Sequence, residues 1–250
     1  MKNLIERIKN KNTIYNLKRK HDDSIIVHHH LGLGDSIICN GLVNMLSKEL
    51  TKIYLPVKTN YLEMVKFLYS DNPKITFFEV SDKNSDEDVR NFAINNQTQI
   101  LKIGFDRVKN KPFNTWFYEQ LQIPYEKSFE LFHIPDTKGK SAELKEHLIK
   151  YYEIKSKDFI IVHNQSHDKK FTLRNLPNTE TVYMTKESDI YGNMLFYNDI
   201  IKEAKEVHCI NSSFLHLVER VETSAQLIYH DIRKSKFKLS DKWKVVSYDN

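Results

Sequence analysis

Residues 24–46, SIIVHHHLGLGDSIICNGLVNML, constrain the fold of this chain more than any other segment. The pattern predicts a buried strand over 24–27, a glycine-bearing turn over 31–36, and a helix over 37–46 that starts near Asp35. A strand, turn and helix in this order is the first unit of an open α/β sheet. Such sheets bind ligands beyond the carboxyl ends of their strands, so the turn is a candidate site.

The turn does not match the common nucleotide-binding fingerprints. Gly32 and Gly34 are expected to take backbone angles that other residues avoid and to let a ligand approach the main chain. However, Ile37 stands where a dinucleotide fingerprint has glycine or alanine, and no carboxylate follows the second predicted strand, 52–57. No Gly-Lys-Ser/Thr follows either, which excludes a Walker-type loop.

Two polar features of the turn leave alternatives open. Asp35 would repel a phosphate at the helix start, so it is either a helix N-cap or a general base directed into a cleft. His28, His29 and His30 precede the turn. Alternation along a strand turns His29 away from the other two, which favours pocket lining over metal binding.

The remaining sequence continues the alternation in two series. Further strands are predicted at 52–57, 74–80 and 99–105, helices at 60–69 and 112–121, and a polar loop at 81–88. A segment rich in charges, with a proline and a glycine, is predicted as a linker at 134–140. The second series has strands at 158–163, 181–184, 206–210, 225–230 and 243–248, and helices at 142–152, 198–205 and 213–220.

This order predicts two facing Rossmann-like domains with mainly parallel sheets, residues 1–135 and 136–250. No apolar run reaches the length of a membrane-spanning helix, and the start of the chain is not signal-like. Cys39 and Cys209 lack metal-ligand spacing and fit reduced thiols, so the expected location is the cytoplasm.

The net charge is +5, and the first twenty residues are the one clearly basic segment. A solvated helix face explains this charge, and so does attraction to anionic substrates, to membrane headgroups at an inner membrane face, or to nucleic acid. The interleaved aromatic side chains of a nucleic-acid platform are absent, so no nucleic-acid partner is expected.

Two polar segments of the second half carry candidate phosphate chemistry. The first follows the strand at 158–163 and contains His163, Lys169, Lys170 and Arg174, a cationic neighbourhood suited to a diphosphate. An exposed polar loop is the plainer interpretation.

The second segment begins with Asn211, Ser212 and Ser213 at a predicted helix start, with His216 one turn further on. Ordinary N-capping explains the small polar residues equally well.

The layout resembles a GT-B glycosyltransferase, and most of all the heptosyltransferase-like family, glycosyltransferase family 9. Leu33-Gly34-Asp35 matches the family's opening turn, and the segment AKEVHCINSSFLH, residues 204–216, is similar to its late helical motif. Where the family has an aspartate, this chain has Asn211, and both halves are short.

The resemblance implies sugar transfer from a nucleotide sugar to a glycan, lipid-linked or other hydroxyl acceptor, as in polysaccharide biosynthesis. Asp35 would activate the acceptor, beside a turn containing His30, Gly32 and Gly34. The donor diphosphate would bind at Ser212, Ser213 and His216, and Lys169, Lys170 or Arg174 would neutralise the leaving group. No metal or cofactor is implied. The alternative is a non-catalytic nucleotide or sugar-phosphate binding protein with a degenerate cleft.

Overall fold

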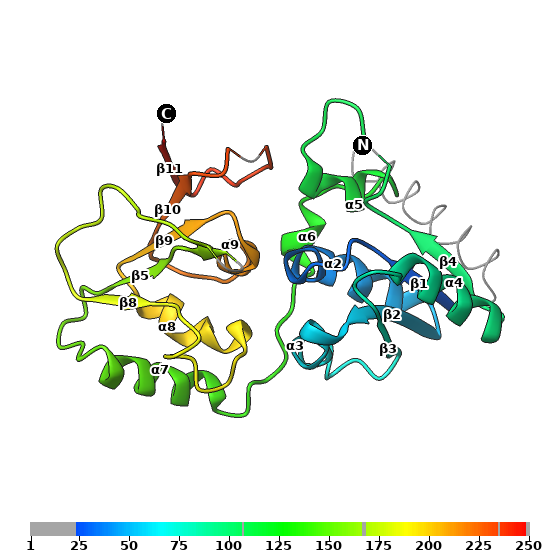
Figure 1. Cartoon of the computed structure of the whole chain (residues 1–250), viewed down its shortest axis with the longest axis horizontal. Helices are drawn as coiled ribbons and strands as arrows, with labels where there is room; N and C mark the ends of the chain where they lie inside the picture. Colours follow the sequence, from blue (N-terminus) through cyan, green and yellow to red (C-terminus); the bar gives the residue numbers. More distant parts are fainter. Residues whose placement is uncertain (1–23, 107, 167–168, 235, 249–250) are drawn as a thin grey trace, which may run out of the picture. The chain divides into compact units, whose positions relative to one another are not determined.

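The computed structural model describes residues 24–106, 108–166, 169–234 and 236–248 (Figure 1). The basic N-terminal segment therefore lies outside the described residues. The chain divides into two units between Pro135 and Asp136, within the predicted linker. Across the described ranges, no helix has both the length and the apolar character needed to cross a membrane.

The first unit is built on a parallel sheet. Its described strands are β1 (Ser24–His28), β2 (Lys52–Lys58), β3 (Ile75–Val80) and β4 (Gln99–Lys102), in the order β3-β2-β1-β4. All three neighbouring pairs are parallel, so the carboxyl ends of the strands share one edge of the sheet. Ile25, Ile26 and Val27 of β1 have no exposed surface, as expected for a central strand covered on both faces.

Short helices and one long helix surround this sheet. They are α2 (Leu33–Glu49), η1 (Thr59–Tyr61), α3 (Leu62–Leu68), α4 (Ser85–Asn95), η2 (Phe113–Thr115), α5 (Trp116–Glu119) and α6 (Lys127–Glu130). Helix α2 packs against α6 at Gly41, where a β-carbon would lie 2.8 Å from the Lys127 carbonyl oxygen. The Tyr118 hydroxyl also joins α5 to α2, donating to the Ile38 carbonyl and accepting from the Leu42 N–H.

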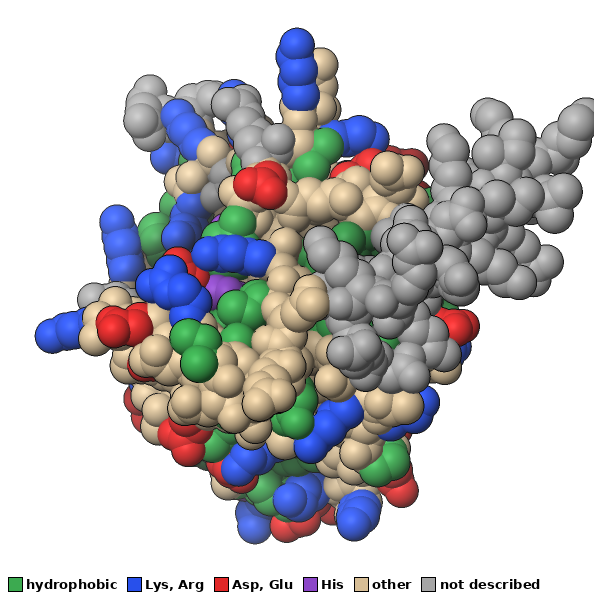
Figure 2. All heavy atoms as spheres, turned by 90° about the vertical axis from the view of Figure 1, so that its right-hand side faces the viewer, with side chains coloured by type: hydrophobic (Ala, Val, Ile, Leu, Met, Phe, Trp, Pro, Cys, Tyr) green, Lys and Arg blue, Asp and Glu red, His purple; other side chains and the backbone are tan. Residues whose placement is uncertain are grey.

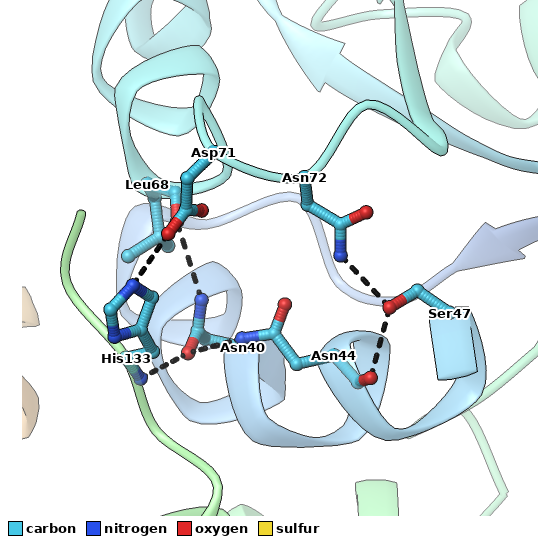
Figure 3. Close-up of polar contacts among 7 residues, drawn as sticks. All are labelled: Asn40, Asn44, Ser47, Leu68, Asp71, Asn72 and His133. Atoms are coloured by element: carbon cyan, nitrogen blue, oxygen red, sulfur yellow. Dashed lines mark hydrogen bonds and ion pairs between the residues drawn. The ribbon is translucent and has the colours of Figure 1, made fainter.

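A polar network fixes the end of the first unit (Figure 3). The buried Asn40 side chain accepts from the His133 N–H (2.9 Å) and from the Asn44 amide (3.2 Å). The His133 ring pairs with Asp71 at 2.6 Å, and the Asn72 amide donates to the Ser47 hydroxyl at 2.8 Å. These bonds attach the segment that leads to the unit boundary to α2 and to the residues after α3.

The second unit has its own parallel sheet, with order β11-β10-β9-β5-β8. Its elements are α7 (Lys140–Tyr151), β5 (Ile160–His163), β6 (Gln165–Ser166), β7 (Lys169–Lys170), β8 (Thr181–Tyr183), η3 (Met194–Tyr197), α8 (Asn198–Glu203), β9 (Glu206–Ile210), α9 (Ser213–Val218), β10 (Gln226–Asp231) and β11 (Trp243–Ser247). Helices α7 and α8 pack side by side (Figure 1). Each unit is thus a Rossmann-like α/β fold, which confirms the predicted fold class.

Several predicted boundaries are wrong. Helix α2 begins at Leu33 because its N-cap is Gly32, not Asp35. Residues 81–88 are not all loop, because α4 begins within them; its first turn holds Asp86, Glu87 and Asp88, whose charges stabilise a helix N-terminus. β4 ends at Lys102, before the predicted end at Phe105. The loop after β5 contains a short antiparallel hairpin, β6 and β7.

Other predictions concerned side chains. Phe117 and Tyr118 are fully buried and belong to the core. Cys39 in α2 and Cys209 in β9 form no disulfide and have no exposed surface. Basic and acidic side chains are interspersed over the visible part of the face in Figure 2.

Candidate functional site

Asp35 lies in the first turn of α2, the helix that follows β1 after the turn at 29–32. Its carboxylate accepts a hydrogen bond from the backbone N–H of Gly32, the N-cap residue. An acidic side chain at the third helical position that bonds back to the N-cap is half of a capping box. Asp35 therefore does stabilise the helix start, although from a different position than the predicted N-cap.

Gly32, at the N-cap of α2, serves a different purpose from the expected one. Gly32 has φ −74° and ψ 150°, an extended conformation that any residue adopts. Gly34 is part of α2 and is not among the described glycines with positive φ. A β-carbon on Gly32 would lie 2.6 Å from the Asp35 Oδ2 atom, so glycine is needed there for the close approach of the carboxylate.

The pKa of Asp35 lies close to neutral pH. Burial raises the pKa of Asp35 from its usual value to about 7, against the hydrogen bond from Gly32, which lowers it. The side chain nevertheless keeps partial exposure. A partly accessible carboxylate with a pKa near 7 is suited to accept a proton from a bound hydroxyl.

The three histidines before the turn diverge. The rings of His28 and His30 both contact Phe105, with centroids 5.0 and 4.5 Å away. The His29 ring instead bonds to the His30 carbonyl. Burial lowers the pKa of all three rings, which favours their neutral forms. Among the described residues, no three His, Cys, Asp or Glu side chains form a group that could hold a metal ion.

His30 lies in an aromatic cluster beside the candidate turn. Its ring contacts Phe113 and Phe117 with centroids 5.1 and 5.8 Å away, in addition to Phe105. Its Nε2 atom is buried without a hydrogen-bond partner. Phe105 is 40% exposed, so an aromatic surface lies at the carboxyl edge of the first sheet.

Asp86 is a residue of this edge that the sequence prediction missed. Its carboxylate binds the Lys102 ammonium at 3.0 and 3.2 Å, at the end of β4, and lies 3.7 Å from His28 Nε2. The side-chain hydrogen bond with Lys102 holds the pKa of Asp86 below its usual value. The acidic run at 86–88, typical of a helix N-terminus, was the signal that could have revealed α4 and hence Asp86.

In the second unit, the structure brings together two predicted residues from segments far apart in sequence. His163 ends β5, and Ser212 follows β9, its neighbour in the sheet. The His163 Nδ1 atom lies 3.1 Å from the Ser212 hydroxyl oxygen. That oxygen also accepts from the Leu215 N–H at 3.4 Å, as the N-cap of α9. Burial lowers the pKa of His163 to about 4, so the ring is neutral, and its Nδ1 atom either accepts from the Ser212 hydroxyl or donates to it, depending on the tautomer.

Arg233 completes this edge, and the sequence prediction missed it. It lies two residues after β10, and its Nη1 atom donates to the Ser166 hydroxyl at 3.0 Å and to the Asn211 carbonyl at 2.9 Å. One exposed guanidinium thus connects the loop after β5 with the turn after β9. No local pattern identifies Arg233, because its partners come from two distant segments.

The predicted basic residues are exposed beside aromatic rings. The Lys169 ammonium lies 5.0 Å from the centroid of the Phe171 ring, and the Lys170 ammonium lies 5.9 Å from that of Tyr183. The Arg174 guanidinium lies 5.1 Å from the centroid of the Tyr248 ring. These aromatic contacts hold the cations by cation–π attraction.

Two further predicted residues lie in α9. Ser213 is its first residue and is half-buried. His216 lies one turn on, and its ring contacts Phe237 edge-on with centroids 5.8 Å apart. Burial and the Arg220 charge lower the pKa of His216 to about 3. A neutral His216 packed on an aromatic ring is a weaker anion ligand than predicted.

At the carboxyl edge of the second sheet, the His163 ring is hydrogen-bonded to Ser212, and the Arg233 guanidinium is hydrogen-bonded to Ser166 and to the Asn211 carbonyl. The first unit offers a carboxylate poised to take a proton. Two Rossmann-like units with these residues at their strand ends define the class of this protein as a two-unit α/β protein.

Comparisons with known proteins agree with this class. The chain is similar to a crystal structure described as the glycosyl transferase family 9 from Veillonella parvula DSM 2008, with a TM-score of 0.57 and 12% sequence identity over 91% of this chain and 87% of that chain. This likeness shows a shared fold. No protein-family model and no curated protein matches the sequence.

Proposed function

We propose that this protein is a glycosyltransferase that moves a sugar from a nucleotide sugar to an acceptor hydroxyl, with Asp35 as general base. The observation that carries the proposal is Asp35, a partly exposed residue in the first turn of α2 whose carboxyl group has its pKa raised by burial to about 7. The shared fold with a glycosyl transferase family 9 protein supports the same class of reaction.

In this proposal the first unit binds the acceptor. The acceptor hydroxyl donates its hydrogen to Asp35 and attacks the anomeric carbon of the donor, which breaks the bond to the diphosphate. Asp35 then carries the proton. The neutral His30 and the exposed ring of Phe105 supply an aromatic surface on which an acceptor sugar can stack.

The second unit binds the donor in this proposal. Negative charge accumulates on the departing diphosphate, and fixed cations and hydrogen-bond donors lower the energy of that charge. The Arg233 guanidinium and the hydroxyls of Ser212 and Ser213 lie near the strand ends, with Lys169, Lys170 and Arg174 on the adjoining loop. The proposal assigns charge neutralisation to these side chains and calls for no metal ion or cofactor.

The decisive experiment is Asp35→Asn in the full chain. A thermal-shift panel of nucleotide sugars first identifies the donor, because a ligand that binds only the folded state raises the melting temperature. Release of nucleoside diphosphate then measures transfer. We expect Asp35→Asn to lower the transfer rate by about 100-fold or more, while the donor dissociation constant stays within about twofold.

Asp82→Asn is the matched control, because this exposed carboxylate of the same unit pairs with Lys58 on the surface. It should leave transfer unchanged. Unaltered transfer in Asp35→Asn would remove the base assignment. Donor binding without product from any acceptor, in the unmodified protein, would favour the non-catalytic binding protein instead.

A further inference from the structure

A continuous chain of polar contacts crosses the sheet of the second unit. The Glu206 carboxylate lies 2.9 Å from His208 Nε2, and His208 Nδ1 lies 3.0 Å from His230 Nε2. His230 Nδ1 lies 2.8 Å from the Tyr248 hydroxyl, which accepts from the Arg174 N–H at 2.7 Å. This series of polar contacts starts at the amino end of β9, passes through β10 and ends beyond the carboxyl end of β11.

The groups at the two ends of this series set a single donor-to-acceptor direction for all of its hydrogen bonds. The Arg174 N–H is an obligatory donor, so the Tyr248 oxygen accepts from it and directs its own proton to His230 Nδ1. A neutral His230 then carries its proton on Nε2 and donates to His208 Nδ1. His208 likewise carries its proton on Nε2 and donates to the Glu206 carboxylate, which only accepts.

The surroundings keep both rings neutral, as this direction requires. His208 is 2% exposed and His230 has no exposed surface. Burial, and to a smaller extent the neighbouring His208, lower the pKa of His230 to about 4. Burial also lowers the pKa of His208, against the Glu206 carboxylate, which raises it. Each nitrogen of both rings has one partner, so neither ring can flip without losing hydrogen bonds.

The far end of the chain reaches the predicted phosphate loop. The Tyr248 hydroxyl holds the Arg174 backbone, while the face of the same ring lies 5.1 Å from the Arg174 guanidinium. Two different parts of Tyr248 thus restrain the backbone and the side chain of one arginine. Arg174 is exposed, so without these contacts its guanidinium would have many conformations.

We propose that Tyr248 is a positioning residue, which the His230–His208–Glu206 chain holds so that Arg174 is fixed for binding a diphosphate group. The identity of the ligand rests on the function proposed above, whereas the positioning does not. The proposal adds Glu206, His208, His230 and Tyr248 to the residues that determine donor binding, although none of them needs to touch the donor.

The first test observes the protonation of the two histidine rings directly in the full chain. Nitrogen-15 NMR of the histidine rings at neutral pH should show His208 and His230 as neutral rings protonated on Nε2. Tyr248→Phe keeps the ring under the guanidinium and removes only the hydroxyl. In that variant the Nδ1 signal of His230 should shift to that of an unbonded acceptor. A charged ring, or a proton on Nδ1 of either histidine, overturns the proposal.

The second test measures the position of the loop. Loss of one hydrogen bond should accelerate hydrogen exchange of the Arg174 amide by about fivefold to tenfold in Tyr248→Phe. The matched control is Tyr191→Phe, which removes a hydroxyl of the same unit that bonds to Glu143. An Arg174 amide that exchanges equally fast in the unmodified protein and in Tyr248→Phe overturns the proposal, as does equal acceleration in Tyr191→Phe.

The third test uses inorganic diphosphate and calorimetry. Tyr248→Phe should weaken binding by about threefold to tenfold, and combining it with Arg174→Ala should weaken binding no further than Arg174→Ala alone. Additive losses contradict the positioning role. If Arg174→Ala leaves diphosphate binding unchanged, the assignment of the loop to donor binding fails, and the two preceding tests still decide whether Tyr248 positions Arg174.

Discussion

Among single residues, Asp35 has the environment that most alters its chemistry. A capping carboxylate on a protein surface has a low pKa, because water and the helix N–H groups stabilise its charge. Burial of Asp35 outweighs the bond from Gly32, so this carboxylate costs the fold stability when it is ionised. Capping alone does not require such an environment, and proton transfer benefits from it.

The pKa of Asp35 predicts how transfer depends on pH. A general base must be unprotonated, and a pKa of about 7 means that half of Asp35 is protonated at that pH. We therefore expect kcat/KM to fall about tenfold per pH unit below the pKa and to reach a plateau above it. The measurement is a pH profile of initial rates with saturating donor. A flat profile between pH 5 and 8 would contradict the assignment.

Gly32→Ala tests whether the close approach of the carboxylate matters. The extended backbone of Gly32 accommodates alanine, but the new β-carbon would lie 2.6 Å from Asp35 Oδ2 and displace it. We expect transfer to fall by about 10-fold to 100-fold, since a displaced catalytic group loses its alignment. The free energy of unfolding should change by less than about 1 kcal/mol. The double variant with Asp35→Asn should be no slower than Asp35→Asn alone.

Residue types at strand ends predicted part of the candidate site. Asp35 and Ser212 each follow a buried strand and His163 ends one, which is visible in the local sequence, and the structure joins His163 to Ser212. Arg233 and Asp86 were missed because their roles depend on partners that only the sheet order brings close. The position of Gly32 was predicted, but the reason for a glycine there is an adjacent side chain and not an unusual backbone angle.

At the scale of elements, hydrophobic alternation predicted the succession of strands along the sequence well. The errors concentrate at the ends of the helices and strands. β9 was predicted with its observed bounds, since a strand between Lys205 and Asn211 is uniformly buried after its first residue. α4 was missed because Val89 is its only buried residue, so a largely exposed helix has a weak apolar stripe. The hairpin of β6 and β7 has two residues in each strand and no pattern long enough to recognise.

Gly41→Ala tests the packing of α2 against α6. A β-carbon would lie 2.8 Å from the Lys127 carbonyl and 3.2 Å from the Tyr118 hydroxyl, and backbone atoms cannot easily move away. Overpacking costs about 1–3 kcal/mol, which offsets or exceeds the helix propensity gained, about 1 kcal/mol. Urea denaturation should show a loss of up to about 2 kcal/mol. The exposed Lys48→Ala on the same helix should change stability by less than about 0.5 kcal/mol. A stabilised Gly41→Ala would contradict this packing.

At the scale of the whole molecule, the two units have parallel sheets but different strand-end chemistry. The described edge of the first sheet carries Asp35 and an aromatic surface, whereas that of the second carries hydroxyls and Arg233. This difference supports distinct ligands for the two units. The sequence predicts two domains because both halves repeat strand, polar turn and helix.

Hydrogen exchange of the full chain tests the assignment of donor to the second unit. A bound nucleoside diphosphate should protect amides at 163–166 and 211–215, because a ligand that binds only the closed state lowers the rate of local opening. At a concentration of about 100 times the dissociation constant, the stabilisation is about 2.7 kcal/mol, or about 100-fold slower exchange. Protection confined to residues 30–36 would reverse the proposed roles of the two units.

The burial of both cysteines has a practical consequence for measurements on this protein. Cys39 and Cys209 have no exposed surface, and burial raises the pKa of the Cys209 thiol, so thiol-reactive dyes should leave both unlabelled in the folded protein. A cysteine introduced on the surface of each unit would then accept a fluorophore without prior removal of the native thiols. Energy transfer between two such dyes would follow the separation of the units as the nucleotide-sugar donor and the acceptor substrate are added.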